Sequence, residues 1–393
     1  MLDQTFAVIL MNVRSIPDRF WMSLVTIIGI AVVVAVLLAF LAMGNGFRAT
    51  LQGSGSEDMA IVMRSGAQSE INSVLTAEQM NLIATAPGVA NDERGPIISA
   101  ELYLIVDAVK RSTQTQANLP FRGLSVKGAE MRDNISISEG RMFEPGKNEI
   151  VVGRAVLSEY EGFELGSKIS LGTASWEVVG IFDAPGSVFA SEIWADGLTL
   201  QSQFNRNNSY QIIRAKLTDP GNVKSIEDFI KNDKRLNLEI KTEKDYFKSQ
   251  TKGTGDLIFK IGIPLSIIMA FGAIAGSLNT MYNSVAQRTT EVATLRAIGF
   301  SSMPVFIGTL VESLVLSLIG GVVGSIAAYL FFDGLTAATL GASFTQIVFD
   351  FQINSATMID GIILALTIGF VGGVFPAARA SRLPVVAAFS AAQ

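Results

Sequence analysis

The feature that most constrains the fold is an uncharged stretch from Phe20 to Phe47. Its apolar run from Trp21 to Met43 would extend about 34 Å as a helix, slightly more than the ~30 Å hydrocarbon layer of a membrane. The run exceeds the ~7 to 15-residue core of a signal peptide, and no A-x-A cleavage site follows it, so a retained anchor is favoured over a cleaved signal. Residues 21–43 are therefore predicted to be the first transmembrane helix.

Three further apolar runs are long enough to cross a membrane. The predicted spans are residues 257–286, 303–332 and 361–378, the last close to the lower limit of ~17 residues. A soluble insertion separates the first two spans, because residues 44–256 hold 23 of the 30 Lys and Arg and 28 of the 35 Asp and Glu. The fold class is thus membrane α-helical, with four transmembrane helices and a large α+β extracytoplasmic domain inserted between helices 1 and 2.

Basic residues in the short loops set the orientation, because Lys and Arg are retained on the cytoplasmic side. They occur before the first span, between the second and third, and after the fourth, at Arg14, Arg19, Arg288, Arg296, Arg379 and Arg382. The short 333–360 loop carries only acidic charge. Both termini (residues 1–20 and 379–393) and the 287–302 loop are therefore predicted to be cytoplasmic, and the 44–256 domain to be periplasmic or extracellular. The chain is expected in a bacterial inner (cytoplasmic) membrane, in contact with its lipids.

The inserted domain has the pattern of mixed strands and short helices. Its start, Gly44–Ser56, is rich in Gly and Ser, and its end, Glu243–Asp256, is compatible with a helical stalk that continues into the second span. Thr76 and Gln79 form a predicted capping box, and Asn222 is expected to cap a second helix. Strands are predicted at residues 59–63, 97–106, 149–152, 168–171, 176–182 and 210–217.

The composition excludes several kinds of chemistry. The chain has no His and no Cys, which removes His-based triads, H-E-x-x-H zinc sites, thiol catalysis and disulfides. The segment Gly140–Asn148 has the wrong spacing for a phosphate-binding loop. A net charge of −5 offers no basic field for nucleic acid. We therefore expect neither a catalytic residue nor a metal or cofactor site on this chain, and no nucleic-acid partner.

The cytoplasmic loop after the second span carries an amphipathic motif. Three apolar residues at a spacing of three predict one face of a short helix, with charges at its ends and a glycine at its exit. Such a ridge is suited to docking into a protein groove, and the alternative is a helix lying flat on the lipid interface. The candidate residues are Arg288, Glu291, Val292, Leu295, Arg296, Ile298 and Gly299.

These residues carry a resemblance to a known family. The stretch Asn279–Gly299, the pair Glu312-Ser313, and the C-terminal residues from Gly373 to Pro384 resemble the signature of the MacB and FtsX class of ABC permeases, which includes the lipoprotein-release permeases. The resemblance implies that the 287–302 loop is a coupling helix on a cytoplasmic ABC ATPase subunit, which would hold ATP and magnesium. It also implies a dimer of permease chains, identical or not, and a periplasmic adaptor.

The resemblance further implies the function of such machines, which are described as mechanotransmitters. The expected role is that of a permease subunit, not itself an enzyme, in export or extraction of a hydrophobic or amphipathic substrate such as a lipid, lipoprotein, peptide or drug. The alternative is an FtsX-like signalling permease that activates an outer partner such as a cell-wall hydrolase. The sequence departs from the pattern of this family in two places. About twenty residues precede the first span, which implies an ATPase on a separate chain, and Phe389 replaces the usual Leu.

Two features inside the spans complete the candidate set. Glu312 is an acid in the apolar layer, where it is costly unless paired. Proton or substrate handling is one interpretation, and a structural hydrogen bond to Ser313, Ser317 or a neighbouring helix is preferred. Small-xxx-small pairs allow close helix packing, inside the bundle or at a dimer seam: Gly272 with Gly276, Gly320 with Gly324, and Gly369 with Gly373.

Overall fold

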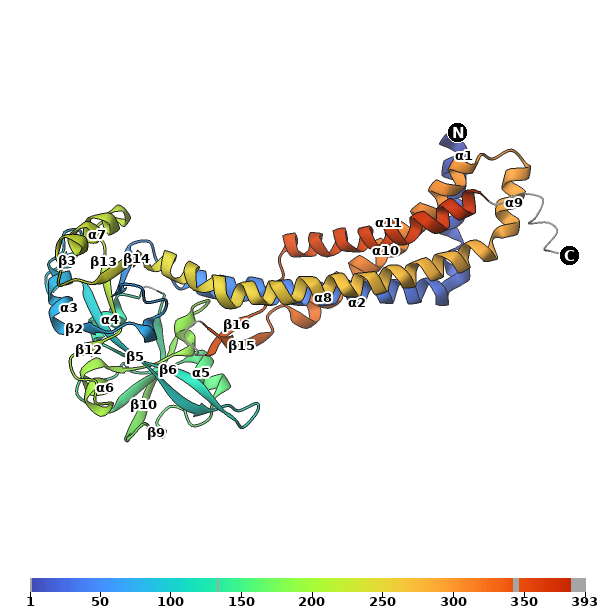
Figure 1. Ribbon diagram of the computed structural model, residues 1–393. Coiled ribbons are helices and arrows are strands. Elements are labelled where there is room, and N and C mark those ends of the chain that lie inside the picture. Colours follow the sequence, from blue (N-terminus) through green and yellow to red (C-terminus); the bar gives the residue numbers. More distant parts are fainter. Residues whose placement is uncertain (1, 133, 342–345, 383–393) are drawn as a thin grey trace. The chain divides into compact units, whose positions relative to one another are not determined.

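The computed structural model describes residues 2–132, 134–341 and 346–382, and the chain divides into two compact units. The membrane unit comprises residues 1–45, 257–335 and 351–393. The outer unit comprises residues 46–256 and 336–350. Long helices build the first unit, and strands with short helices build the second (Figure 1). The motif positions Leu383, Pro384 and Phe389 lie outside the described residues.

Four helices of the described chain have the length and apolar composition of membrane spans. Two shorter helices accompany them, α1 (Leu2–Arg14) before the first and α9 (Thr289–Ala297) between the second and third. The order of spans and inserted domain is the predicted one. The long helices are α2 (Phe20–Gly53), α8 (Glu243–Gln287), α10 (Ser302–Phe332) and α11 (Ser355–Ser381).

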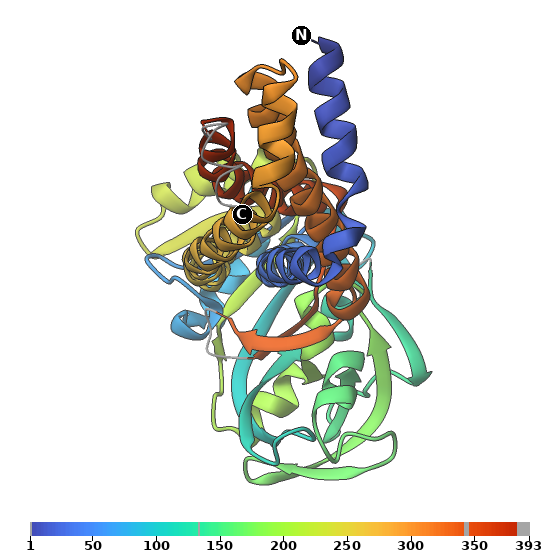
Figure 2. The same ribbon diagram turned by 90° about the vertical axis from the view of Figure 1, so that its right-hand side faces the viewer.

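Helices α2 and α8 lie side by side and pack through a reciprocal pair of glycines (Figure 2). A Cβ at Gly44 would stand 2.3 Å from the ring of Phe259, and a Cβ at Gly262 would stand 2.6 Å from Phe40. Each glycine therefore makes room for a phenylalanine of the other helix. The apolar core of the membrane unit draws on all four long helices, at Ile30, Val33, Val34, Leu38, Ala270, Ala328, Ala365 and Ile368.

The helices extend further than the apolar runs. Helix α2 continues to Gly53, so most of the Gly- and Ser-rich segment Gly44–Ser56 is helical, and the outer unit begins within it at residue 46. Helix α11 covers Ser355–Ser381, beyond the predicted 361–378 at both ends. Helix α8 runs without interruption from Glu243, through the predicted stalk, to Gln287. Hydropathy marks only the part of a helix that lies in lipid, whereas backbone hydrogen bonding continues past it.

The outer unit is built on a mixed ten-stranded sheet with the path β14-β1-β13-β5-β6-β11-β8-β10-β7, and β9 pairs with β10. Most neighbours are antiparallel, but β11 with β6 and β10 with β8 are parallel. The strands are β1 (Met59–Arg64), β5 (Ile98–Val109), β6 (Gln116–Leu124), β7 (Ser136–Gly140), β8 (Glu149–Gly153), β9 (Lys168–Leu171), β10 (Ala174–Asp183), β11 (Ile193–Asp196), β13 (Ile212–Lys216) and β14 (Leu238–Thr242).

Short elements complete the outer unit. Its helices are α3 (Ala77–Ala84), α4 (Val126–Glu130), α5 (Arg154–Glu159), α6 (Gly197–Gln203) and α7 (Val223–Asn232). Its 3-10 turns are η2 (Glu70–Asn72), η3 (Val188–Ser191) and η4 (Pro220–Asn222), and η1 (Pro17–Arg19) belongs to the membrane unit. Two small ribbons join β2 (Leu75–Thr76) with β12 (Ser209–Tyr210) and β3 (Asn91–Asp92) with β4 (Gly95–Pro96).

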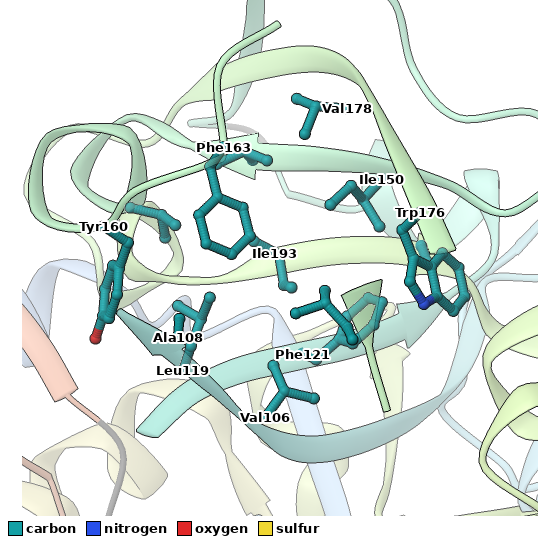
Figure 3. Close-up of a cluster of buried hydrophobic side chains, with 14 of the residues drawn as sticks. Val106, Ala108, Leu119, Phe121, Ile150, Tyr160, Phe163, Trp176, Val178 and Ile193 are labelled. Carbon is teal, nitrogen blue, oxygen red and sulfur yellow. The ribbon is translucent and has the colours of Figure 1, made fainter. Parts of the chain in front are cut away.

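Two clusters of buried apolar side chains stand out among the described residues of the outer unit. The first is centred on Phe121 and Trp176, whose rings meet edge to face at 5.1 Å, and includes Tyr160 and Phe163 (Figure 3). The second lies under α3 and α7 and includes Ile83 and Ile226 among its members. With no cysteine in the chain, this apolar burial takes the place that disulfides hold in many extracytoplasmic domains.

The two predicted helix caps have different outcomes. The capping box is confirmed, because Thr76 accepts from the Gln79 backbone and the Gln79 side chain accepts from the Thr76 backbone. Asn222 occupies the N-cap position of α7, as predicted, but its side chain makes no capping hydrogen bond. That residue ends the turn η4 with helical dihedral angles, and its side chain donates to Thr218 Oγ1 at 2.6 Å. Asp219 caps the turn instead.

The predicted short loop 333–360 contains a β-hairpin that belongs to the outer unit. Strands β15 (Thr336–Leu340) and β16 (Gln346–Asp350) pair antiparallel. The Val348 backbone N–H donates to Ser191 Oγ at 3.0 Å, and the rings of Phe349 and Phe47 meet edge to face at 5.5 Å. Strands β15 and β16, which lie between α10 and α11 in the chain, are therefore part of the outer unit.

Candidate coupling site

Helix α9 is the element around which the candidate site is built. Arg288 occupies its N-cap position, Glu291 lies in the first turn and Arg296 in the last turn. Gly299 ends the helix with a φ of +103°, a conformation that side-chain-bearing residues rarely adopt, so glycine is the residue suited to this exit. Acid at the start and base at the end complement the helix dipole.

The three apolar residues of the motif do not share one exposed ridge. Val292 is buried in a small core with Val285, Val305 and Ala380. Ile298 is 69% exposed and caps the helix one residue beyond its end. Leu295 is half-buried between them. The three residues therefore do not form the single docking face that was predicted. Val292 packs against the bundle, whereas Ile298 is exposed.

The side chain of Arg288 points into the membrane unit and pairs with Glu312. The Arg288 Nη1 donates to Glu312 Oε2 at 3.0 Å, and both residues are only 4% exposed. Ser284 Oγ donates to the other oxygen, Oε1, at 3.3 Å. Glu312 is thus held by groups around the α8 to α9 junction. Ser313 and Ser317 hydrogen-bond elsewhere, to Gly369 O and Ser313 O respectively.

Two further contacts extend this pair to the N-terminal helix. Arg288 Nη2 donates to the Asn12 backbone oxygen at 3.4 Å and also contacts the Ser15 hydroxyl. Arg19 Nη1 donates to Ser284 Oγ at 2.6 Å. Sequence reasoning used Arg19 only as an orientation signal and did not connect Asn12 or Ser15 with the site. Their positions in the chain are too far from Arg288 for any local pattern to show the contact.

The polar cluster formed by Arg288, Glu312, Ser284 and Arg19 joins four elements at one point. It ties the start of α9 to α8, to α10 and to the segment that leads into α2. At the other end of α9, Arg296 Nη1 donates to the Ser381 backbone oxygen at 2.7 Å, which fixes that end to α11. Hydrogen bonds therefore connect the two ends of α9 to α10 and α11 and, through Ser284 and Arg19, to α8 and the segment before α2.

The small-residue pairs divide into two classes. A Cβ at Gly324 would stand 2.5 Å from the Ala31 oxygen and one at Gly320 would stand 2.9 Å from the Ile27 oxygen, so this pair seats α2 on α10. Gly369 and Gly373 make room for Ser317 and Ser313 in the same way, which seats α11 on α10. A Cβ at either residue of the third pair, Gly272 and Gly276, would meet nothing within 4 Å among the described residues.

Comparison with protein families covers almost the whole chain. Residues 23–232, more than half of it, match the MacB-like periplasmic core domain, and residues 263–385 match the FtsX-like permease C-terminal. The chain belongs to the MacB/FtsX-like permease family. The resemblance found in the sequence is therefore confirmed, as is the fold class of four long apolar helices with an α+β periplasmic core domain between the first and second.

Several known proteins are similar to this chain. A macrolide export ATP-binding/permease protein MacB of Neisseria gonorrhoeae is 24% identical and aligns with 97% of this chain and 60% of its own length. A pyoverdine export ATP-binding/permease protein of Pseudomonas entomophila is 23% identical over 95% of this chain and 58% of its own. The solved structure of the periplasmic region of MacB from Actinobacillus actinomycetemcomitans aligns with 52% of this chain over 96% of its own length, with 12% identity and a TM-score of 0.37.

The chain spans about half the length of the curated relatives it matches. It aligns with their permease part, and the ATP-binding part of these relatives lies outside the aligned region. This MacB/FtsX-like permease is a multi-pass membrane protein with a periplasmic core domain, of the kind found in ABC export systems, whose permeases work with an ATPase.

Proposed function

We propose that this MacB/FtsX-like permease is the transmembrane subunit of a mechanotransmission ABC transporter. A separate cytoplasmic ATPase subunit, which binds ATP and magnesium, docks on α9 and drives export or extraction of a hydrophobic or amphipathic substrate. The attachment of α9 to α10 and α11, and to α8 through Ser284, supports the proposal, because it gives ATPase closure a path into the spans. The exposed Ile298 beside this anchored helix is the contact offered to the ATPase.

Export is favoured over the signalling alternative by the relatives. Those aligned with nearly the whole chain carry macrolide export and pyoverdine export in their names. A periplasmic adaptor that receives the cargo is part of the same proposal. Activation of a cell-wall hydrolase has no comparable support among these relatives.

A second permease chain completes the proposed machine. The seam is assigned to the face of α8 that carries Gly272 and Gly276, since these glycines have no packing partner among the described residues. Asn279 and Asn283 continue this exposed side of the helix towards the cytoplasmic end. Side-chain amides in lipid are stabilised by a partner helix that hydrogen-bonds to them.

Replacing Ile298 by Asp is expected to release a co-expressed ABC ATPase subunit from the detergent-purified complex. A charge at the apolar contact would lower the affinity at least tenfold, since burying an unpaired carboxylate costs more than about 1.4 kcal/mol. The measurement is the ATPase-to-permease ratio after affinity purification. Ile298 is a sharper probe than Leu295, which is half-buried against the bundle.

The matched control is Ile298→Leu, which keeps the apolar contact and should retain the ATPase. Both variants should elute as folded permease with an unchanged melting temperature, because residue 298 is exposed. A full complement of ATPase on Ile298→Asp would remove the docking role of α9.

A further inference from the structure

The outer unit contains a network of buried charged residues that the coupling mechanism does not use. We call it the buried charge network, and each of its members is at most 5% exposed. It holds three arginines and four glutamates, a formal charge of 3 − 4 = −1. The members are Glu70, Glu101, Arg122, Arg132, Glu192, Arg214 and Glu243.

Arg122 on β6 is the centre of the network. Its Nη1 donates to Glu70 Oε2 at 2.7 Å and to Glu101 Oε2 at 2.9 Å. Its Nε and Nη2 donate to the two oxygens of Glu192, each at 2.7 Å. One guanidinium thus faces three carboxylates, which are brought to it by η2, by β5 and by the residue before β11.

The remaining ion pairs do not supply a spare positive charge. Arg132 donates to both oxygens of Glu101 at 2.9 and 2.7 Å, and Arg214 pairs with Glu243 at 2.6 Å. No other Lys or Arg forms an ion pair with these four glutamates within residues 2–132, 134–341 and 346–382. An uncompensated charge in an interior of low dielectric costs several kcal/mol, so one carboxylate must be neutralised.

The hydrogen bonds indicate which carboxylate this is. Glu192 accepts from Arg122 through both oxygens and also from Trp194 Nε1 at 2.8 Å. Glu101 accepts from two arginines, and although its burial works in the opposite direction, Arg132, Arg122 and Arg214 hold its pKa at about 2. Glu70 accepts from Arg122 through one oxygen only. Among the three carboxylates around Arg122, Glu70 therefore has the least support for a negative charge.

Among the described residues that line the cavity beside Glu70, Arg122 is the only cation. This cavity has a volume of about 50 Å³, and the polar side chains that line it are Glu70, Tyr103, Arg122, Glu192, Tyr246, Gln250 and Gln346. Burial raises the pKa of the Glu70 carboxyl; Arg122 lowers it, while Glu192 and Glu101 raise it further. The two tyrosines can donate a hydrogen bond but carry no charge near neutral pH.

We propose that the outer unit binds one proton at Glu70, so that the buried charge network is electrically neutral with three guanidiniums and three carboxylates. The protonated carboxyl keeps one oxygen as acceptor for Arg122 and offers an O–H to a neighbouring acceptor. The network also reaches the first residue of α8, Glu243, whose Oε2 accepts from the Ser56 backbone N–H at 3.2 Å.

Whether stability rises or falls with pH depends on which protonation state of Glu70 the folded chain prefers. The folded chain holds the Glu70 proton more tightly than the unfolded chain does, so this stabilisation is complete at pH below the unfolded pKa. It is lost as pH rises through the raised pKa of Glu70 in the fold. The melting temperature of the outer unit should therefore fall towards alkaline pH because of Glu70.

The test compares the full-length wild-type permease with Glu70→Gln in detergent, from about pH 5 to about pH 9. Glutamine imitates the protonated side chain, so the variant should melt at least about 2 °C higher than wild type at the alkaline end and have a flatter pH profile. The infrared spectrum of the wild type should show a protonated-carboxyl band at neutral pH, and Glu70→Gln should remove it.

Glu101→Gln is the matched control, and its effect should have the opposite sign. It takes a carboxylate away from both Arg122 and Arg132, so it should lower the melting temperature at every pH or prevent folding. The proposal is overturned if Glu70→Gln melts below wild type at alkaline pH, or if the protonated-carboxyl band at neutral pH is absent from the wild type or unchanged in the variant.

Discussion

Replacing Glu312 by Ala is expected to lower the free energy of unfolding of the permease by about 3 to 5 kcal/mol. The substitution leaves Arg288, which is 4% exposed, as a buried charge without its carboxylate partner. It also removes the acceptor of the Ser284 hydroxyl. The measurement is thermal or denaturant unfolding of the purified permease in detergent, read as the change in midpoint relative to wild type.

The matched control is the double variant Arg288→Met with Glu312→Leu. Replacing both members of a buried ion pair by apolar groups of similar size is often close to neutral, so most of the stability should return. We expect transport-coupled ATPase activity to stay low in this double variant, because α9 has lost its polar attachment to α8 and α10. A single Glu312→Ala variant with wild-type stability would show that the pair does not hold the junction.

Adding one methyl group at Gly324 is expected to destabilise the bundle by about 1 to 3 kcal/mol. The new Cβ would stand 2.5 Å from the Ala31 backbone oxygen and 2.9 Å from its Cα. Backbone atoms of a helix cannot rotate away, so α2 and α10 would have to separate along their contact. The melting temperature of Gly324→Ala in detergent measures this cost.

Gly276→Ala is the matched control for the same residue change in the same membrane unit. A Cβ there meets nothing within 4 Å in the described chain, so the monomer should melt as wild type does. Under the proposed dimer, the same variant should weaken self-association, which analytical ultracentrifugation can measure. Equal loss of stability in both variants would contradict the division of the glycines into internal and external pairs.

Much of the membrane unit could be predicted from the sequence, because lipid imposes a length and an apolar composition that a single chain displays openly. The residues at which the helices end could not be predicted in this way. Residues 44–53 are polar and glycine-containing, yet they continue α2 because packing partners such as Phe259, against Gly44, favour the helix. Local propensity is a weak guide where tertiary contacts decide.

The sheet of the outer unit was only partly predictable for a related reason. Strand β6 contains Pro120, a residue type that often interrupts a strand. The pairing of β6 with β11 begins only at the next residue, Phe121. The missing N–H of Pro120 is therefore not needed on that side. Strands β11 and β14 are short and owe their conformation to neighbours far away in the sequence. Such pairing has no local signal.

The docking role of the α9 segment stays a prediction, but the structure gives Arg288 a different role from the one the sequence suggested. Arg288 was read as part of a docking surface, whereas its side chain enters the bundle and neutralises Glu312. The two residues are separated by a helix and a loop, and only the fold brings them together. Ile298 is the strongly exposed apolar residue of the motif, and we propose it as the contact for the ATPase.

The most direct test of the account is the side of the membrane that α9 faces. The chain has no cysteine, so single cysteines at Ile298 and at the exposed Glu93 of the outer unit can be labelled without background. With a membrane-impermeant maleimide, Glu93→Cys should react in intact spheroplasts, and Ile298→Cys only after the inner membrane is permeabilised. Reaction of Ile298→Cys in intact spheroplasts would contradict the docking of α9 on a cytoplasmic ATPase.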